Sequence, residues 1–298
     1  MRRKLIKQGA GGYTISLPIK WVRDHGLEPG EEIDLVEEGN ALKVLSTHPN
    51  LSIKSTTLVV EKASFKFYRS MIGGLYRAGY DEIRVEFKDS SVLLELQKTI
   101  DLLPGYELLD IMKHSCLVKN TSGQQVVDLH THFLKIVHSI NTMFTIIEGN
   151  LKSKKSDSDQ QLSLLRNNVL KNRDLIIRTI GEQRLTDEKH LPYYTLVSYS
   201  WMIARSLYYL SKSVTFSTPT FLRLFNEIRE YFHTVFSMPN HSDAFKIREG
   251  YDLVFKKVEE HLRNGSSPAL AAYLVGICMG IESCNSALLV LKKDTHLD

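Results

Sequence analysis

The spacing of hydrophobic and polar residues changes twice along the chain. Residues 1–48 carry short alternating runs broken by Gly and Pro, a pattern typical of strands and tight turns. Residues 49–121 mix strand-like alternation with helical periodicity, and residues 122–298 are helical in pattern throughout. The sequence therefore predicts an α+β multidomain chain with a small β-rich domain, a small α+β segment and an all-α domain.

The first segment predicts four strands and one short helix. Pro18 fits the first turn of a helix, and Gly26 fits the position after its end. A unit of this size is too small to form an adequate core alone, so we expect it to exchange strands with a second copy. The predicted elements are strands over residues 4–7 and 13–17, a helix over 18–25, and a hairpin of strands 32–36 and 41–45.

The middle segment predicts a small sheet with two helices packed on one face, which buries both helices at low cost. Ser90 or Ser91 is expected to cap the second helix. In chain order the predicted elements are strand 57–61, helix 64–78, strand 82–87, a helix ending at Leu103, and strands 106–112 and 116–119.

The last segment predicts a bundle of antiparallel helices, because the connections between them are short. Residues 195–203 parallel residues 273–281, and each stretch lies in the third helix of a set of three. This indicates two repeated three-helix units, although two apolar helices can also resemble each other by chance. The six predicted helices cover residues 125–150, 160–182, 190–213, 219–237, 242–263 and 267–292.

Composition favours a cytoplasmic protein. The net charge is only +4, and no apolar run follows the charged N-terminus, so a signal peptide is not expected. The longest apolar run, residues 270–280, is shorter than the roughly 18 residues of a membrane span and fits a buried helix better. Cys116, Cys278 and Cys284 form no CxxC motif and are expected to be reduced and buried.

Charges are segregated at the start of the chain. Basic residues come first. The next stretch, from Asp24 to Glu38, contains acidic residues and no lysine or arginine. If the first strands and helix share a face, that face is strongly positive and suits contacts to DNA phosphates. The alternative is that lysines protect exposed strand edges from aggregation. The early basic residues are Arg2, Arg3, Lys4, Lys7, Lys20 and Arg23.

Residues 3–45 resemble the AbrB/MazE/SpoVT swapped-hairpin DNA-binding domain. The resemblance rests on Gly12-Tyr13-Thr14-Ile15-Ser16-Leu17-Pro18, on the short basic helix that follows, and on Gly26-Leu27 and Pro29-Gly30-Glu31. It implies a dimeric β-barrel in which the first strand and the helix contact DNA. Tyr13 and Val22 stand where that family often has basic residues. The candidate DNA-binding residues are Arg2, Arg3, Lys4, Lys7, Tyr13, Thr14, Lys20 and Arg23.

The rest of the chain resembles archaeal proteins that join such a domain to a PhoU-like helical domain. The stretch Leu103-Pro104-Gly105-Tyr106-Glu107-Leu108-Leu109 is similar to the one that precedes the helices there, and six helices in two sets of three match that architecture. The resemblance implies a regulator of phosphate uptake. The predicted domains are therefore 1–48, 49–121 and 122–298.

Some PhoU proteins hold iron or zinc clusters through carboxylates, but here the matching positions are occupied by Asn168, Asn172, Arg205 and Ser283. Amides and a guanidinium do not replace hard carboxylate ligands, so we expect no metal cluster and no cofactor. Glu249 and Asp252 remain in the fifth helix, three residues apart, and fit a solvated face.

Other candidate chemistry is sparse. His130 and His132 face different sides of a helix, so we expect them and His138 to be surface residues. No GxGxxG, GK[ST], GxSxG or HExxH motif occurs, and we do not expect an enzyme. The aromatic residues Tyr193, Tyr194, Tyr199, Trp201, Tyr208 and Tyr209 fit core packing, or alternatively a partner or ligand groove in which Arg205 attracts an anion.

Together these patterns predict a dimeric DNA-binding transcription regulator whose helical domain responds to a signal or a protein partner. The alternative is an adaptor that docks on a phosphate transporter or a sensor kinase. In that case the N-terminal domain serves only for dimerisation. Neither hypothesis includes insertion into a membrane.

Overall fold

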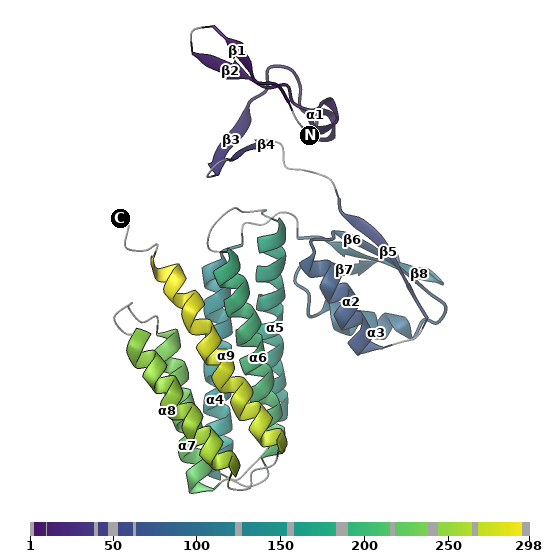
Figure 1. The fold of residues 1–298 in the computed structure, drawn as a ribbon. Coiled ribbons are helices and arrows are strands. Elements are labelled where there is room, and N and C mark those ends of the chain that lie inside the picture. Colours follow the sequence, from purple (N-terminus) through teal and green to yellow (C-terminus); the bar gives the residue numbers. More distant parts are fainter. Residues whose placement is uncertain are drawn as a thin grey trace. The chain divides into compact units, whose positions relative to one another are not determined.

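The chain divides between Ile53 and Lys54 into two compact units, and each is described by itself. The structure is a computed structural model (Figure 1), and the residues that it describes are 3–9, 11–38, 41–46, 53–61, 64–122, 127–153, 158–182, 190–214, 218–237, 244–263 and 268–293.

The first unit contains two separate antiparallel hairpins and one short helix. Strands β1 (Ile6–Gln8) and β2 (Gly12–Thr14) form one hairpin, and β3 (Ile33–Glu38) and β4 (Ala41–Ser46) form the other. Helix α1 (Ile19–Asp24) lies between them in the sequence. The predicted strands 4–7 and 13–17 are wrong in extent: the observed strands lie closer to the turn and include Gln8 and Gly12, and the outer residues have no neighbouring strand to pair with among the described residues.

The residues that the structure describes in the first unit form no hydrophobic core. None of its described side chains is buried, and α1 contains no buried residue. Pro18 also lies one residue outside the helix, in extended conformation at the N-cap, which corrects the predicted start of the helix. The exposed large apolar side chains are Leu5, Ile6, Tyr13, Ile15, Ile19, Leu35 and Leu42. A single copy of this unit therefore leaves exposed to water the apolar side chains whose burial normally stabilises a fold.

The second unit begins with a four-stranded sheet covered on one face by two helices (Figure 1). The strand order is β5-β6-β8-β7, with β5 parallel to β6 and the other pairs antiparallel. Tyr68, Ile72, Ile83 and Leu96 are fully buried in its core. Its elements are β5 (Ser55–Val60), α2 (Phe65–Arg77), β6 (Glu82–Phe87), α3 (Val92–Ile100), β7 (Tyr106–Leu109) and β8 (Ser115–Asn120). The predicted α+β segment with both helices on one sheet is thus observed.

Three details of this layer differ from the prediction. Helix α3 ends at Ile100, three residues before the predicted end at Leu103. Neither serine caps α3 through its side chain: Asp89 instead accepts from the backbone N–H of Ser91 at 2.9 Å and from its hydroxyl at 2.7 Å. The strand predicted over residues 106–112 ends at Leu109, because Asp110 takes a positive φ of 47° that breaks the extended backbone.

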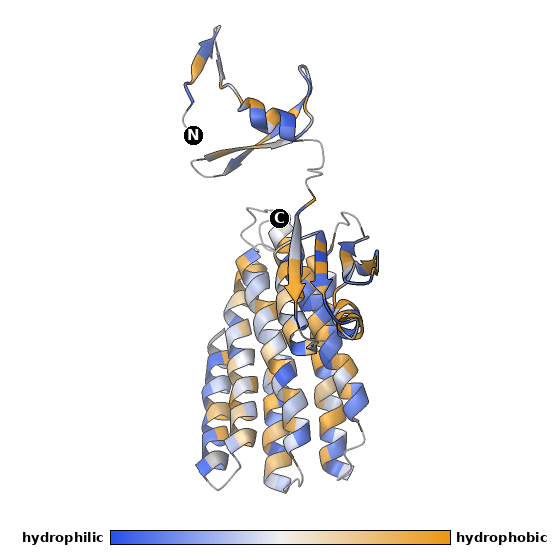
Figure 2. Cartoon of the chain, turned by 90° about the vertical axis from the view of Figure 1, so that its right-hand side faces the viewer, coloured by the Kyte–Doolittle hydropathy of each residue, from blue (hydrophilic) through white to orange (hydrophobic). Residues whose placement is uncertain are grey.

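The remainder of the second unit is a bundle of long helices, as predicted (Figure 1). Hydrophobic residues recur along each helix, coloured orange in Figure 2, and they form one continuous core. The helices are α4 (Leu129–Ser153), α5 (Asp159–Glu182), α6 (His190–Ser213), α7 (Pro219–Phe236), α8 (Ala244–Arg263) and α9 (Pro268–Lys293).

Helices α6 and α9 form the most extensive contact in the bundle. The two stretches that resemble each other in sequence, 195–203 and 273–281, lie within these helices. A Cβ added at Gly280 would lie 2.6 Å from Ile203 Cγ1, and one at Gly276 would lie 2.8 Å from Ser206 Oγ. The missing side chains at these glycines therefore allow the two helices to approach closely.

Helix α9 is, within the described ranges, the one helix that is long and apolar enough by length and composition to cross a membrane. Its apolar character has a simpler explanation in the fold, because Leu274, Ile277, Cys278 and Ile281 are buried in the bundle core. A core helix of a soluble protein passes the same test.

Candidate functional site

The basic residues of the first unit lie on its surface. Arg3, Lys4, Lys7, Lys20 and Arg23 are exposed, and Arg2 lies outside the described residues. Lys20 and Arg23 are three residues apart on α1 and therefore share one face of it. One chain thus presents two basic groups, one at the hairpin β1–β2 and one on α1.

The hairpin β1–β2 places a basic side chain and an aromatic ring on one face. Lys7 is directly opposite Tyr13 in the antiparallel register, so their side chains point to the same side of the hairpin. Thr14 is opposite Ile6 on the other face, and its hydroxyl donates to the Ile6 carbonyl at 3.5 Å. A cation beside an exposed tyrosine can contact a phosphate and a sugar or base together.

The residues considered above as possible metal ligands make other contacts. Asn172 Oδ1 lies 2.7 Å from His132 Nδ1, and the Asn172 amide donates to the Asn168 carbonyl at 2.8 Å. Asp252 pairs with Arg248 at 3.6 Å on the surface of α8. In the part of the chain that the structure describes, no three His, Cys, Asp or Glu residues gather in a way that could hold a metal ion.

The histidines and aromatic residues of the bundle divide between core and surface. His130 and His138 are exposed as predicted. His132 is half-buried and forms a hydrogen bond with Asn172 of the neighbouring helix α5. The core interpretation holds for Tyr193 and Tyr208, which are buried, whereas Tyr194, Tyr199 and Tyr209 are exposed. Exposed Arg205 lies 5.8 Å from the ring of Tyr209, a cation–π contact.

The sequence analysis missed a buried carboxylate at the contact between α2 and α5. Asp174 on α5 is fully buried and forms ion pairs with three arginines. Arg69 and Arg77 come from α2, and Arg173 is its neighbour on α5. A helical pattern could have revealed it, because Asp174 lies on the same face as buried Leu170, four residues earlier.

A second buried charge, Arg178, joins the bundle to the α+β layer one turn further along α5. Its side chain is 3 % exposed and donates to the backbone carbonyl oxygens of Tyr76 at 3.2 Å and Tyr80 at 2.6 Å. It also donates to Asp81 at 2.8 Å and lies 5.0 Å from the ring of Tyr76. The contact between the two cores of the second unit is therefore polar and ionic.

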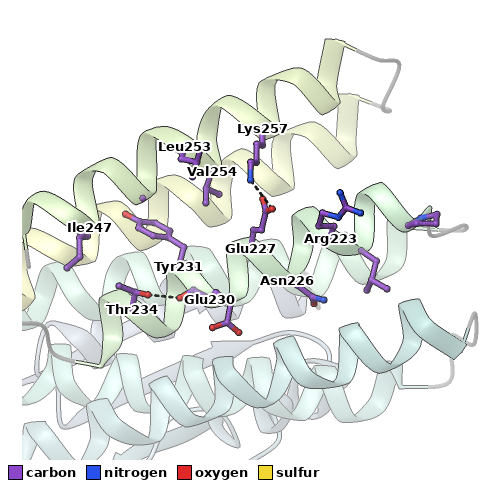
Figure 3. Close-up of a pocket in the computed structure, with 13 residues that line it drawn as sticks. Arg223, Asn226, Glu227, Glu230, Tyr231, Thr234, Ile247, Leu253, Val254 and Lys257 are labelled. Atoms are coloured by element: carbon purple, nitrogen blue, oxygen red, sulfur yellow. Dashed lines mark hydrogen bonds and ion pairs between the residues drawn. The ribbon is translucent and has the colours of Figure 1, made fainter.

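A groove of about 670 Å³ runs between α7 and α8 (Figure 3). Ile247, Val254 and Tyr231 contribute apolar surface, and Glu227 and Lys257 form a 2.9 Å ion pair beside them. The Tyr231 hydroxyl is buried and has no hydrogen-bond partner among the described residues. Burial is the largest cause that raises the pKa of this hydroxyl, which therefore stays protonated at neutral pH. The groove suits an apolar ligand or side chain.

Comparisons of the chain with protein-family models, with curated proteins and with solved structures find no match.

Proposed function

We propose that this protein is a dimeric DNA-binding transcription regulator of phosphate uptake or metabolism, with a PhoU-like helical domain that responds to a signal or partner. The observation that carries the proposal is the first unit. It combines exposed basic residues with exposed large apolar side chains, a combination that suits a dimeric DNA-binding module.

A second copy of the chain supplies what the first unit lacks. Swapped hairpins would pair the open edges of the two-stranded sheets and bury the exposed Leu5, Ile15, Leu35 and Leu42 in a shared barrel. The same exchange would place two copies of the Lys7–Tyr13 face beside each other. Such a dimer would contact a roughly two-fold symmetric DNA site.

The helical domain supports a regulatory role of the PhoU type. Its six helices pack as α4–α6 and α7–α9, with α6 against α9 between the two sets. The polar contact of α5 with the α+β layer offers a route by which a change in the bundle could reach the segment that follows the first unit. The link to phosphate uptake rests on the family resemblance alone.

Fluorescence anisotropy of the full-length protein on duplex DNA from upstream of its own gene tests the proposal. Log affinity should fall with log salt by roughly 0.9 per phosphate contacted. A Lys7→Ala/Arg23→Ala variant should lose binding and have a smaller salt slope. The matched control is the Lys66→Ala/Arg84→Ala variant, which lacks two exposed basic side chains of the second unit. It should bind DNA as the unmodified protein does. Two results would contradict DNA recognition by this unit: equal affinity for the upstream and the scrambled DNA, or unchanged affinity in the Lys7→Ala/Arg23→Ala variant.

The second candidate is an adaptor, and the groove between α7 and α8 favours it, because its apolar lining suits a protein side chain. The first unit would then serve only to dimerise. A dimer that has no sequence preference for DNA would support this function over transcription regulation.

A further inference from the structure

The cluster around Asp174 carries an excess of positive charge. Three guanidinium groups, those of Arg69, Arg77 and Arg173, surround a single carboxylate. The side chains of Arg69 and Arg173 are each 14 % exposed and that of Arg77 is 27 % exposed. Asp174 therefore balances only one of three charges that are largely withdrawn from water, an arrangement that is costly without further negative charge.

The hydrogen bonds of the cluster leave many donors unused. Each guanidinium has five N–H donors. Among the described residues, the hydrogen bonds that the side chains of these arginines donate are all accepted by the two carboxylate oxygens of Asp174. Arg69 Nη1 is buried without a hydrogen-bond partner among the described residues. Burial lowers the pKa of Arg173 and is the largest influence on it, and nearby Arg77 and Arg69 lower it further, although Asp174 acts in the opposite direction.

Gly73 makes room for this arrangement. It lies between Arg69 and Arg77 on α2, and a Cβ at this position would be 2.5 Å from Arg69 Nη1 and 3.4 Å from Arg77 Nη1. Any larger residue would push the flexible end of Arg69 away. The backbone of α2 thus allows two guanidinium groups to converge on one point of α5.

We propose that Arg69, Arg77 and Arg173 form a binding site for a small doubly charged oxyanion of the phosphate or sulfate class. Planar guanidinium groups bind such anions through paired N–H donors, and the excess of two positive charges matches a dianion. Two of the arginines belong to the α+β layer and the third to the bundle. The bound anion therefore holds α2 against α5. The site is separate from the DNA contacts of the proposed function.

Isothermal titration of the full-length protein with sodium phosphate, and separately with sodium sulfate, tests the site at constant ionic strength. Both anions should bind saturably, and the melting temperature should rise with their concentration as expected for a ligand of the folded state. Sodium chloride at the same ionic strength should do neither. Arg77→Gln should weaken binding roughly tenfold or more, because it removes a charged donor at the exposed side of the cluster.

Two further variants separate the site from folding and from DNA binding. Gly73→Ala keeps every charge and improves the helix propensity of α2, yet should weaken anion binding by displacing Arg69. Lys7→Ala/Arg23→Ala should bind phosphate as the unmodified protein does, whatever its effect on DNA. Equal responses to chloride and phosphate, or unchanged affinity in both Arg77→Gln and Gly73→Ala, would overturn the proposal.

Discussion

Arg178 of α5 donates a 2.8 Å hydrogen bond to Asp81, which lies between α2 and β6 of the α+β layer. Asp81 also accepts from the backbone N–H of Lys54 at 3.1 Å, and Lys54 is the first residue of the second unit. A single carboxylate therefore links a bundle helix to the point where the chain arrives from the first unit. A change in the position of α5 could reach the start of the second unit through these two hydrogen bonds.

Arg178→Met should lower the free energy of unfolding by roughly 2–4 kcal/mol, because the carbonyl oxygens of Tyr76 and Tyr80 lose their buried donor. Urea denaturation monitored by circular dichroism measures the change. Asp81→Asn keeps a hydrogen-bond acceptor on a side chain that is one-third exposed. It should therefore lower the free energy of unfolding by less, about 1 kcal/mol. Equal losses in the two variants would argue against the contribution of the carbonyl contacts.

Asp174→Asn should destabilise the protein by roughly 3–5 kcal/mol, since it leaves three guanidinium groups without their only carboxylate partner among the described residues. Asp252→Asn on α8 is the matched control. Asp252 is 62 % exposed and, among the described residues, pairs with Arg248 on the surface, so the change should stay within about 0.5 kcal/mol. Thermal and urea unfolding of both variants provide the comparison. A small effect at Asp174 would mean that other anions already neutralise the arginines.

The three cysteines should not react with a chromogenic disulfide reagent at pH 8 while the protein is folded. Burial raises the pKa of Cys116 to about 11 and those of Cys278 and Cys284 to about 12, so almost no thiolate is present. All three should react after denaturation. Rapid labelling of the native protein would show that one of these thiols is accessible.

The same shifts predict how stability depends on pH. The folded-state pKa values are raised, so the folded protein retains protons that the unfolded chain releases. The contribution of the thiols is fully present below pH 9, their ordinary pKa, and is lost as pH rises toward about 12. Replacing Cys278 by Ala should flatten this alkaline loss, which urea midpoints measured between pH 8 and 10.5 would reveal.

Leu35→Asp should convert a dimer into a monomer if the first unit dimerises through its exposed apolar strands. Leu35 is 57 % exposed in the single chain and would carry a charge into the shared core. Light scattering after size-exclusion chromatography gives the mass. Leu164→Asp, at a 65 % exposed position on α5, is the control and should leave the mass unchanged. A monomeric unmodified protein at micromolar concentration would itself contradict the dimer.

Helical periodicity predicted the bundle well, because buried positions such as Ile136, Ile140 and Phe144 on α4 repeat with the period of a helix within long segments. The sheet was predicted from local alternation, but its strand order depends on contacts far apart in the sequence. Strand ends were less accurate. Asp110 adopts a backbone conformation that no alternation pattern signals.

The candidate site was predicted only in part. Exposure of Lys7 and Arg23 follows from their charge, whereas burial of Asp174 does not. A charged residue in a helix normally indicates a solvated face. Asp174 shares a face with buried Leu170, but its ion-pair partners on α2 lie about a hundred residues earlier and are not visible in the local pattern. In the first unit, the contacts that would complete the fold of a dimer come from another chain, and local sequence patterns do not specify them.

The shift of 78 residues that aligns residues 195–203 with residues 273–281 also aligns Asp174 with Asp252. If the two sets of helices descend from one duplicated ancestor, the ancestral position was inherited twice. One copy became the buried anchor of the α+β layer, whereas the other stayed on the surface with a local partner. On that interpretation, equivalent helix positions in the two halves have different environments: Asp174 holds the α+β layer, and Asp252 lies in solvent.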